Sequence, residues 1–192
     1  MRPCYQVRLT RPCIGKPEHG GSAAAQNGRM IPVMSKLEEI ETIKQLKYRY
    51  LRCLDTKKWA ELSETFTEDA QAAYDSGKYT YDGRDAIMKF LEESLGDASI
   101  VSRHQGHHPE IEIRDDGTAR GTWYLEDYVI FGGMGAELSG AAFYEDEYVK
   151  VDGEWKIRTT GYARTYEQFS GRDGVQQLRT MFQQPEKADA AK

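Results

Sequence analysis

The stretch YLRCLDTKKW, residues 50–59, decides the fold. It ends a run, beginning at Lys36, in which apolar side chains recur every three or four residues, as on one face of a helix. Tyr50 and Asp55 lie about 140° apart on such a helix, so they share a face only if the helix ends at Asp55. We predict that end as the floor of an apolar pocket. The alternative is that Asp55 caps a short helix holding Trp59.

The rest of the pattern predicts helices first and a sheet afterwards. A second short helix is expected around residues 59–66, then a hairpin turning at Ser76-Gly77, then a helix that starts at residues 82–85. Strands are expected at residues 100–114, 118–131, 138–151 and 155–166, and a short helix at residues 175–182. This order predicts an α+β fold in which a curved antiparallel sheet wraps helices around a cone-shaped cavity.

The 192 residues suffice for one folded domain, which we place at residues 34–170. Residues 1–33 are rich in Pro and Gly and show no periodicity, so we expect disorder there, or an extension upstream of a true start at Met34, with a transit peptide as the alternative. Residues 171–192 are expected to form a C-terminal tail.

Composition narrows the class of protein. The net charge is −5, and the acidic residues lie mainly after residue 33, which argues against nucleic-acid binding. No apolar run approaches the roughly 18 residues of a membrane span, which argues against a membrane partner. The three cysteines form no Cys-x-x-Cys pair, so neither a disulfide framework nor a zinc site is predicted, and a reducing cytoplasmic location is the default.

The densest polar cluster is RHQGHHP, residues 103–109, within a predicted strand. Strand alternation places His104, Gly106 and His108 on one face unless Gly106 forms a bulge. Imidazole is a natural general base near neutral pH. The alternatives are a solvated strand edge, a histidine satisfied in the core, or a metal site from His104 and His108, for which no third ligand motif is present.

A second polar pair lies on the later strands. Alternation places Asp127 on the same apolar face as Trp123, and Arg164 lies among aromatic residues on the last strand. The alternative for Asp127 and Arg164 is an ordinary cross-strand ion pair. The sequence contains no Rossmann glycine motif, no P-loop and no nucleophile elbow. A set of Tyr, Asp and His residues around an aromatic pocket is enough for proton transfer without a cofactor.

Several segments, in order, resemble the SnoaL-like group of the nuclear transport factor 2-like superfamily. These are residues 43–55, 104–111, 123–127, 140–144 and 160–164. Within the group, the resemblance is closest to the bile-acid 7α-dehydratases, and it spans about residues 40–173. Scytalone dehydratase and lindane dehydrochlorinase resemble the chain more distantly.

The resemblance implies site residues, cofactor use and assembly. It implies catalytic roles for Tyr50, Asp55, His104 and Asp127, and substrate contacts for Arg164, Trp123, Tyr162 and Phe143. It also implies a homotrimer, no cofactor and no metal.

The implied activity is dehydration of a hydroxysteroid or bile-acid-like 3-oxo-Δ4 substrate, with or without a coenzyme A thioester. His104 would remove a proton while Asp55 holds the imidazole. Tyr50 and Asp127 would serve the leaving hydroxyl or the developing enolate, and Asp127 could be an acid only if the pocket keeps it protonated. The alternatives are a ketosteroid isomerase-like enzyme, with Asp55 as the base, and a non-catalytic binding or structural subunit of the same fold.

Overall fold

In the computed structural model, which describes residues 35–172 and 178–182, helices pack against one six-stranded sheet. The helices are α1 (Lys36–Asp55), α2 (Trp59–Ser63) and α3 (Arg84–Leu95), and a 3-10 turn, η1 (Gly132–Met134), precedes β5. The strands are β1 (Phe66–Tyr74), β2 (Tyr79–Asp82), β3 (Ile100–Ile113), β4 (Ala119–Phe131), β5 (Ala136–Val151) and β6 (Glu154–Gly171).

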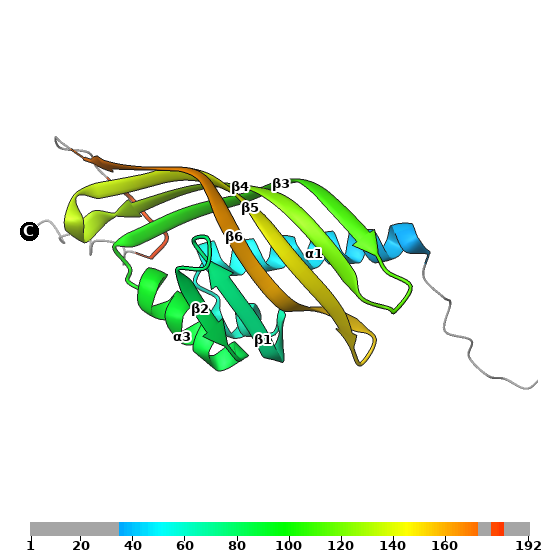
Figure 1. Ribbon diagram of the computed structural model, residues 1–192. Helices are drawn as coiled ribbons and strands as arrows, with labels where there is room; N and C mark the ends of the chain where they lie inside the picture. The colour runs from blue at the N-terminus through cyan, green and yellow to red at the C-terminus, as the bar shows by residue number, and fades with distance from the viewer. Residues whose placement is uncertain (1–34, 173–177, 183–192) are drawn as a thin grey trace, which may run out of the picture. The chain divides into compact units, whose positions relative to one another are not determined.

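The sheet has the strand order β2-β1-β6-β5-β4-β3. Strands β3 to β6 form an antiparallel meander, and β1 pairs with β6 in parallel. The long strands curve over α1, which lies along the concave side of the sheet, while α3 lies beside β1 and β2 (Figure 1). The predicted α+β fold, with a curved sheet around helices, is confirmed.

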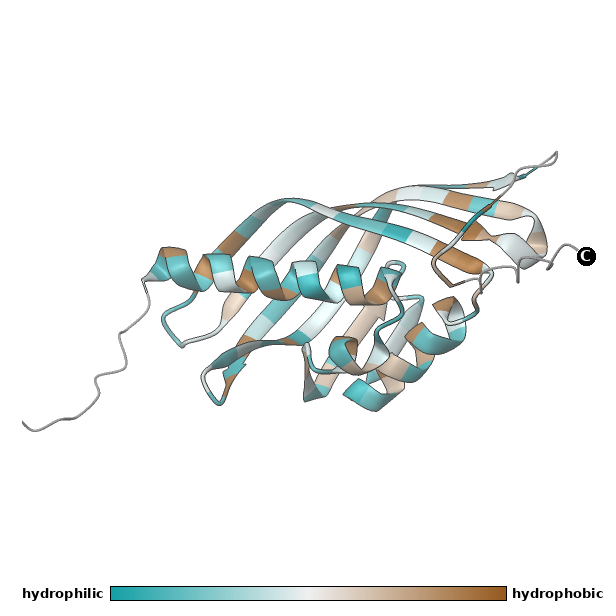
Figure 2. Ribbon diagram, turned by 180° about the vertical axis from the view of Figure 1, so that it is seen from behind, coloured by the Kyte–Doolittle hydropathy of each residue, from teal (hydrophilic) through white to brown (hydrophobic). Residues whose placement is uncertain are grey.

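Helix α1 begins at a capping box. The Ser35 hydroxyl accepts a hydrogen bond from the Glu38 backbone amide, and the Glu38 side chain accepts one from the Ser35 amide. Hydrophobic residues recur in bands along the helix (Figure 2). Four of the predicted apolar positions are buried, namely Ile43, Leu46, Tyr50 and Leu54. Leu37 is 78% exposed, because it lies in the first turn, so the buried face is shorter than predicted.

The segment after α2 differs from the prediction. Helix α2 ends at Ser63, and β1 begins at Phe66, which was expected to belong to the second helix. Phe66 pairs with Ile157 of β6, and the Ile157 amide donates a 2.8 Å hydrogen bond to the carbonyl of Thr65. The spacing of Trp59, Leu62 and Phe66 suits a helix, but pairing with the last strand decides the structure.

The other expected turns are present. Asp152 and Gly153 have φ values of 52° and 85°, and they join β5 to β6 in the tight hairpin that the Asp-Gly signal predicts. Of the helix expected at residues 175–182, residues 175–177 lie outside the described residues, and residues 178–182 are not helical. Among the described residues, no helix combines the length and apolarity needed to cross a lipid bilayer.

Candidate active site

Asp55 is the last residue of α1, as the spacing predicted. The chain turns immediately afterwards, because Thr56 caps the helix and Lys57 adopts a left-handed φ of 54°. The alternative that Asp55 caps the next helix is wrong. The N-cap of α2 is Lys58, which makes no side-chain cap hydrogen bond. Asp55 is therefore free to point toward the sheet.

Hydrogen bonds from β3 hold the carboxylate of Asp55. The Ser102 hydroxyl donates to Oδ1 at 2.8 Å, and the His104 backbone amide donates to Oδ2 at 2.8 Å. His104 Nδ1 lies 2.6 Å from Oδ1. The side chains of His104 and Asp55 are 9% and 20% exposed, so the pair is mostly but not completely shielded from water.

Gly106 explains how the helix end comes so close to β3. A Cβ built at Gly106 would lie 2.9 Å from Leu51 Cδ1, closer than side-chain atoms pack. The strand bulges not at Gly106, the alternative considered above, but between His107 and Glu110. His108 lies in this bulge with a φ of 46° and is exposed. The predicted sharing of one face therefore holds for His104 and Gly106 but fails for His108.

The position of His108 also bears on the metal alternative. His104 is directed to Asp55, whereas His108 lies in the bulge with its ring centroid 5.9 Å from that of His107. Among the described residues, no group of three His, Cys, Asp or Glu side chains is arranged to hold a metal ion. The structure thus does not assemble the His104–His108 metal site considered above.

Asp127 is the direct cross-strand neighbour of His104. Side chains in such positions share a face, with Cβ atoms roughly 4.5–5.5 Å apart. Asp127 is 4% exposed, and Arg164 clamps it through both terminal nitrogens. Nη1 lies 2.6 Å from Oδ1 and Nη2 lies 2.7 Å from Oδ2. The site therefore places two hydrogen-bonded pairs, Asp55–His104 and Asp127–Arg164, side by side on the inner face of the sheet.

The Asp127–Arg164 pair crosses over β5 rather than joining adjacent strands. It passes above Gly140, where a Cβ would lie 2.6 Å from Arg164 Nη1 and 3.1 Å from Asp127 Oδ1. Glycine at this position lets the guanidinium reach the carboxylate. The alternative of an ion pair is thus what the structure shows, although the two residues lie on strands separated by a third.

The ion pair favours the positive charge on Arg164. Burial opposes the charge on Arg164, but the hydrogen bonds and negative charge of Asp127 outweigh it, so the pKa of Arg164 is raised. Both oxygens of Asp127 accept hydrogen bonds from the guanidinium. The geometry therefore supports Asp127 as a partner for Arg164 and does not support it as a proton donor.

Tyr50 lies in a cluster of buried tyrosines. Its hydroxyl is 3.3 Å from that of Tyr74, and its ring meets the ring of Tyr144 edge to face. Burial raises the pKa of all three phenols well above the ordinary value, so they stay protonated as hydrogen-bond donors. Tyr162 packs against Tyr74 and Tyr144, and the guanidinium of Arg164 lies 4.9 Å from its ring centre. Ring contacts thus link Tyr50 to the Arg164 pair.

Two residues predicted to contact substrate lie elsewhere. Phe143 is 45% exposed and stacks on Tyr124, on the opposite side of β5 from its buried neighbours Ala142 and Tyr144. Trp123 is completely buried, and its Nε1 donates a 2.9 Å hydrogen bond to the Tyr148 hydroxyl. The structure brings neither residue to the Asp55–His104 pair, because alternation assigns the face of Phe143 and core packing encloses Trp123.

Sequence reasoning missed a buried ion pair beneath the tyrosines. Lys47 Nζ lies 2.7 Å from Asp146 Oδ2, and both side chains are 0% exposed. Asp146 also accepts hydrogen bonds from Tyr148 at 2.7 Å and Thr160 at 2.6 Å. Burial lowers the pKa of Lys47, and the negative charge of Asp146 counteracts this. The available signal was Lys47 on the apolar face of α1, one residue after Leu46.

Sequence reasoning also missed Ser102. Ser102 lies two residues before His104 on a predicted strand, so the side chains of both residues must point to the same face. That spacing was the signal that could have found it.

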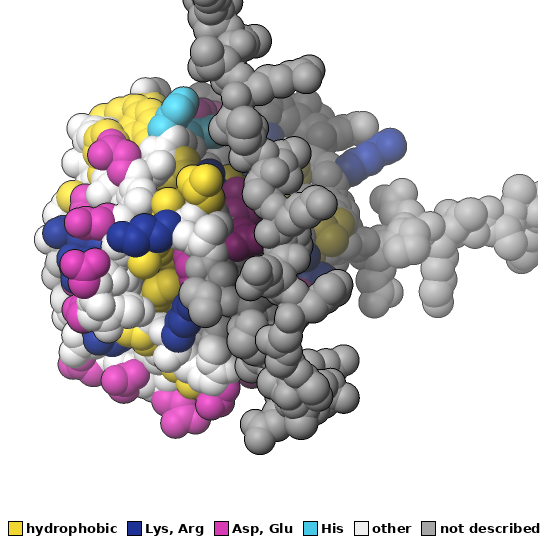
Figure 3. Space-filling view, turned by 90° about the vertical axis from the view of Figure 1, so that its right-hand side faces the viewer, with side chains coloured by type: hydrophobic (Ala, Val, Ile, Leu, Met, Phe, Trp, Pro, Cys, Tyr) yellow, Lys and Arg dark blue, Asp and Glu magenta, His cyan; other side chains and the backbone are white. Residues whose placement is uncertain are grey.

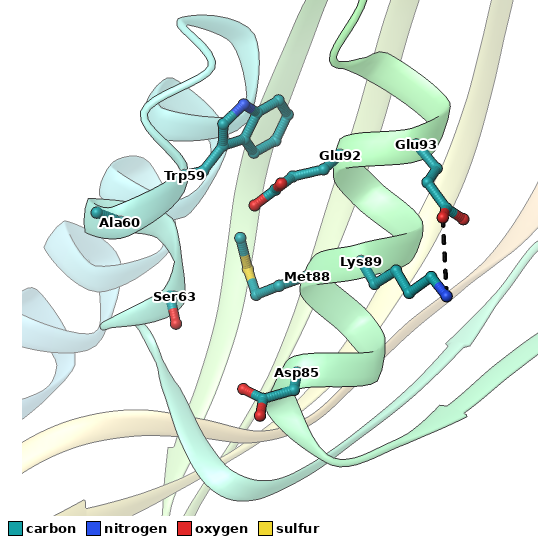
Figure 4. Close-up of a pocket in the computed structure, with 8 residues that line it drawn as sticks. All are labelled: Trp59, Ala60, Ser63, Asp85, Met88, Lys89, Glu92 and Glu93. Carbon is teal, nitrogen blue, oxygen red and sulfur yellow. Dashed lines mark ion pairs between the residues drawn. The ribbon is translucent and has the colours of Figure 1, made fainter.

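The molecule has a separate surface groove between α2 and α3 (Figure 4). Trp59 and Met88 lie along it with acidic side chains, and Lys89 Nζ is 3.9 Å from Glu93 Oε1. The residues that line this groove are different from those of the Asp55 and Asp127 clusters. Elsewhere on the described surface, Figure 3 shows acidic, basic and hydrophobic side chains interspersed on the face in view, with no broad basic patch.

Solved structures similar to this chain show the same fold. One is a scytalone dehydratase candidate from Novosphingobium aromaticivorans, with 23% identity, a TM-score of 0.64, and coverage of 78% of this chain and 97% of that chain. A second is the hexachlorocyclohexane dehydrochlorinase LinA-type3 from Novosphingobium barchaimii, with 20% identity, a TM-score of 0.63, and coverage of 76% and 97%. A third is a candidate aromatic ring hydroxylase from Novosphingobium aromaticivorans, with 20% identity, a TM-score of 0.64, and coverage of 72% and 96%.

These identities are low, so the three likenesses establish the fold and leave the reaction open. The family model for the SnoaL-like domain matches residues 35–161, which is well over half of the chain. The matched region includes Tyr50, Asp55, His104 and Asp127, and it ends before Arg164. The chain therefore belongs to the SnoaL-like domain family.

Proposed function

We propose that the chain is a cofactor-independent hydro-lyase that removes water from a hydroxysteroid or bile-acid-like 3-oxo-Δ4 substrate. The observation that carries this proposal is the contact between Asp55 and His104, 2.6 Å between Oδ1 and Nδ1 at the end of α1. A carboxylate on Nδ1 fixes the tautomer with its proton on that nitrogen, which leaves Nε2 with a lone pair. Nε2 is then a general base.

The proposed reaction begins at a ring C–H bond made acidic by the conjugated ketone. His104 Nε2 takes the proton, and the electron pair of the C–H bond passes into the enone as an enolate. The enolate then expels the hydroxyl group as the new C=C bond forms. The proton held by His104 is available to the departing hydroxyl, which leaves as water and restores the neutral imidazole.

The remaining groups bind the substrate and stabilise its developing negative charge by hydrogen bonding. Burial raises the pKa of Tyr50 and of Tyr162, so either phenol can donate a hydrogen bond to the enolate oxygen or the leaving hydroxyl. Asp127, the cross-strand neighbour of His104, holds Arg164 in place as a substrate contact on the inner face of the sheet. Proton transfer of this kind contributes roughly 10²–10⁴-fold to the rate, and positioning supplies the rest.

The enzymatic rival is an isomerase with Asp55 as the base. Both oxygens of Asp55 already accept hydrogen bonds from β3, from Ser102 and His104. A base needs a lone pair directed at the substrate, which His104 offers more readily than Asp55. This difference favours elimination with an imidazole base over isomerisation with a carboxylate base. A non-catalytic binding or structural role remains the rival from another class.

A substrate panel tests the proposal. The full chain would be incubated with 3-oxo-Δ4 steroids hydroxylated at ring carbon 7 or 12, each as free acid and as coenzyme A thioester where a side-chain acid exists. We expect one compound to lose one water with a red-shifted chromophore. An isomer of unchanged mass would favour the isomerase, and tight binding without turnover would favour a binding protein.

We also propose the homotrimer that the family resemblance implies and the cytoplasmic location that the cysteine pattern suggests. The stacked pair Tyr124 and Phe143, with ring centres 4.9 Å apart, leaves exposed aromatic surface on the outer face of the sheet. Such surface suits contact with another copy of the chain. Light scattering on the purified chain should give about three times its 21.9 kDa mass, and a monomer would contradict this proposal.

A further inference from the structure

Ser102 occupies a position where a hydroxyl needs a specific reason. It lies partly buried on the inner face of β3, and its cross-strand partner is Val129, which is 5% exposed. A small apolar side chain would suit this surface, and a hydroxyl shielded from water is costly unless it is hydrogen-bonded. The hydroxyl finds its partner in Asp55, 2.8 Å away.

The hydrogen bond from Ser102 falls on a particular oxygen. Ser102 and the His104 ring both meet Oδ1 of Asp55, at 2.8 and 2.6 Å, while the His104 backbone amide takes Oδ2. Donors on both oxygens fix the plane of the carboxylate. A free carboxylate can rotate about its last bond, and that rotation would remove the acceptor from the line of Nδ1–H.

We propose that Ser102 is a positioning residue that holds Oδ1 of Asp55 against the imidazole of His104. Its hydroxyl keeps the carboxylate plane aligned with the ring, so the proton stays on Nδ1 and the lone pair stays on Nε2. Ser102 touches no substrate in this account and acts through Asp55. Its importance for turnover rests on the proposed function, whereas its effect on the histidine does not.

The other charged groups around His104 do not substitute for this hydroxyl. Asp127, across from His104 on β4, is committed to Arg164 of β6 through both oxygens. Lys57 lies just beyond the end of α1, and its ammonium donates a hydrogen bond to the carbonyl of Leu95. Within the part of the chain that the structure describes, Asp55 therefore has two side-chain donors, the hydroxyl of Ser102 and the imidazole of His104.

The test is nitrogen-15 NMR of the histidine side chains in the full chain without substrate. In the wild type, we expect His104 as the Nδ1–H tautomer with a downfield, slowly exchanging Nδ1 proton. Ser102→Ala should weaken that proton signal and shift the ring toward a mixture of tautomers. Ser102→Thr keeps the hydroxyl and should retain the wild-type spectrum, whereas Asp55→Asn should lose the signal as a positive control.

Two results would overturn the proposal. One is a Ser102→Ala spectrum identical to the wild type. The other is loss of the signal in both Ser102→Ala and Ser102→Thr, which would assign the effect to packing rather than to the hydroxyl. Once a substrate is known, Ser102→Ala should lower kcat by about 3- to 10-fold with KM within about twofold, and Ser102→Thr should restore it. Because the NMR spectrum needs no substrate, it tests the role of Ser102 independently of the dehydratase proposal.

Discussion

Asp55 and Asp146 are two shielded carboxylates with similar numbers of hydrogen-bond partners. Asp55 belongs to the candidate active site, whereas Asp146 belongs to a structural ion pair. Asp55 accepts hydrogen bonds from one serine and twice from His104, and the pair is 20% and 9% exposed. Asp146 binds Lys47, Tyr148 and Thr160, and its ion pair is 0% exposed. The count of hydrogen bonds therefore does not distinguish a reactive site from a structural one.

The two carboxylates differ in whether the side chain that each one binds can still accept a proton. The imidazole that binds Asp55 has a second nitrogen, Nε2, whose lone pair can still accept a proton. The ammonium of Lys47 has no lone pair with which to accept a proton. It is also enclosed by aromatic rings, with its Nζ 3.5 Å from the ring centre of Tyr144. A carboxylate thus becomes part of a site when its partner can still react and lies within reach of a ligand.

The largest expected effect is on His104. We expect His104→Ala to lower turnover by about 10²–10⁴-fold, because the general base is lost. The free energy of unfolding should change by less than about 2 kcal/mol, since one partly exposed pair is removed. Steady-state kinetics and denaturant titration would measure both.

The matched control is His107→Ala, on the same strand but pointing to the other face, which should keep near wild-type turnover. Equal losses in the two variants would remove the Asp55–His104 pair from the mechanism.

The next largest effect is expected on stability, at the buried Lys47–Asp146 ion pair. We expect Asp146→Ala to destabilise the fold by about 3–5 kcal/mol, because it leaves the ammonium of Lys47 buried without its counter-charge. Denaturant titration measures the loss, with Asp69→Ala on the exposed side of β1 as the control. If Asp146→Ala unfolded like the control, Asp146 would not be the structural counterpart of Asp55.

A smaller effect is expected at the two glycines that permit close approach. Gly140→Ala should cost about 1–3 kcal/mol, because the new methyl group would meet Nη1 of Arg164, which a bidentate ion pair holds in place. Gly106→Ala is the matched variant, and it should cost less, since its near neighbour is the mobile end of Leu51. Thermal unfolding of both variants gives the order, and the reverse order would contradict the rigidity of the Arg164 clamp.

The smallest effect on activity is expected on the outer face. Phe143→Ser should leave turnover per active site near wild type, because Phe143 lies on the face of the sheet away from His104. It should shift the light-scattering mass toward the monomer if the Tyr124–Phe143 surface joins copies. An unchanged mass would place the contact between copies elsewhere.

The fold and part of the site follow from local pattern. The end of α1 at Asp55, the hairpin at Asp152-Gly153 and the long meander were predictable, because helical period, turn chemistry and strand alternation are properties of neighbouring residues. The same alternation placed His104 and Asp127 on inner faces. It also assigns Phe143 to the face opposite Ala142 and Tyr144, although the resemblance had suggested a substrate contact there.

The rest depends on register between distant strands. The start of β1 at Phe66 is decided by its pairing with Ile157, some 90 residues later. The bulge after His107 turned His108 out of line, and Pro109, which has no amide proton to donate to the strand ladder, was a local sign of it. The ion pair of Asp127 with Arg164 crosses over Gly140, so its existence depends on three strands at once.

The central claim is that His104 removes a proton during elimination of water. The most direct measurement is the product mass of a 7-hydroxy-3-oxo-Δ4 steroid incubated with the wild-type chain and, in parallel, with His104→Ala. The account predicts a product lighter by one water with the wild type and unconverted substrate with the variant. Unchanged mass with the wild type, or equal conversion by both, would contradict it.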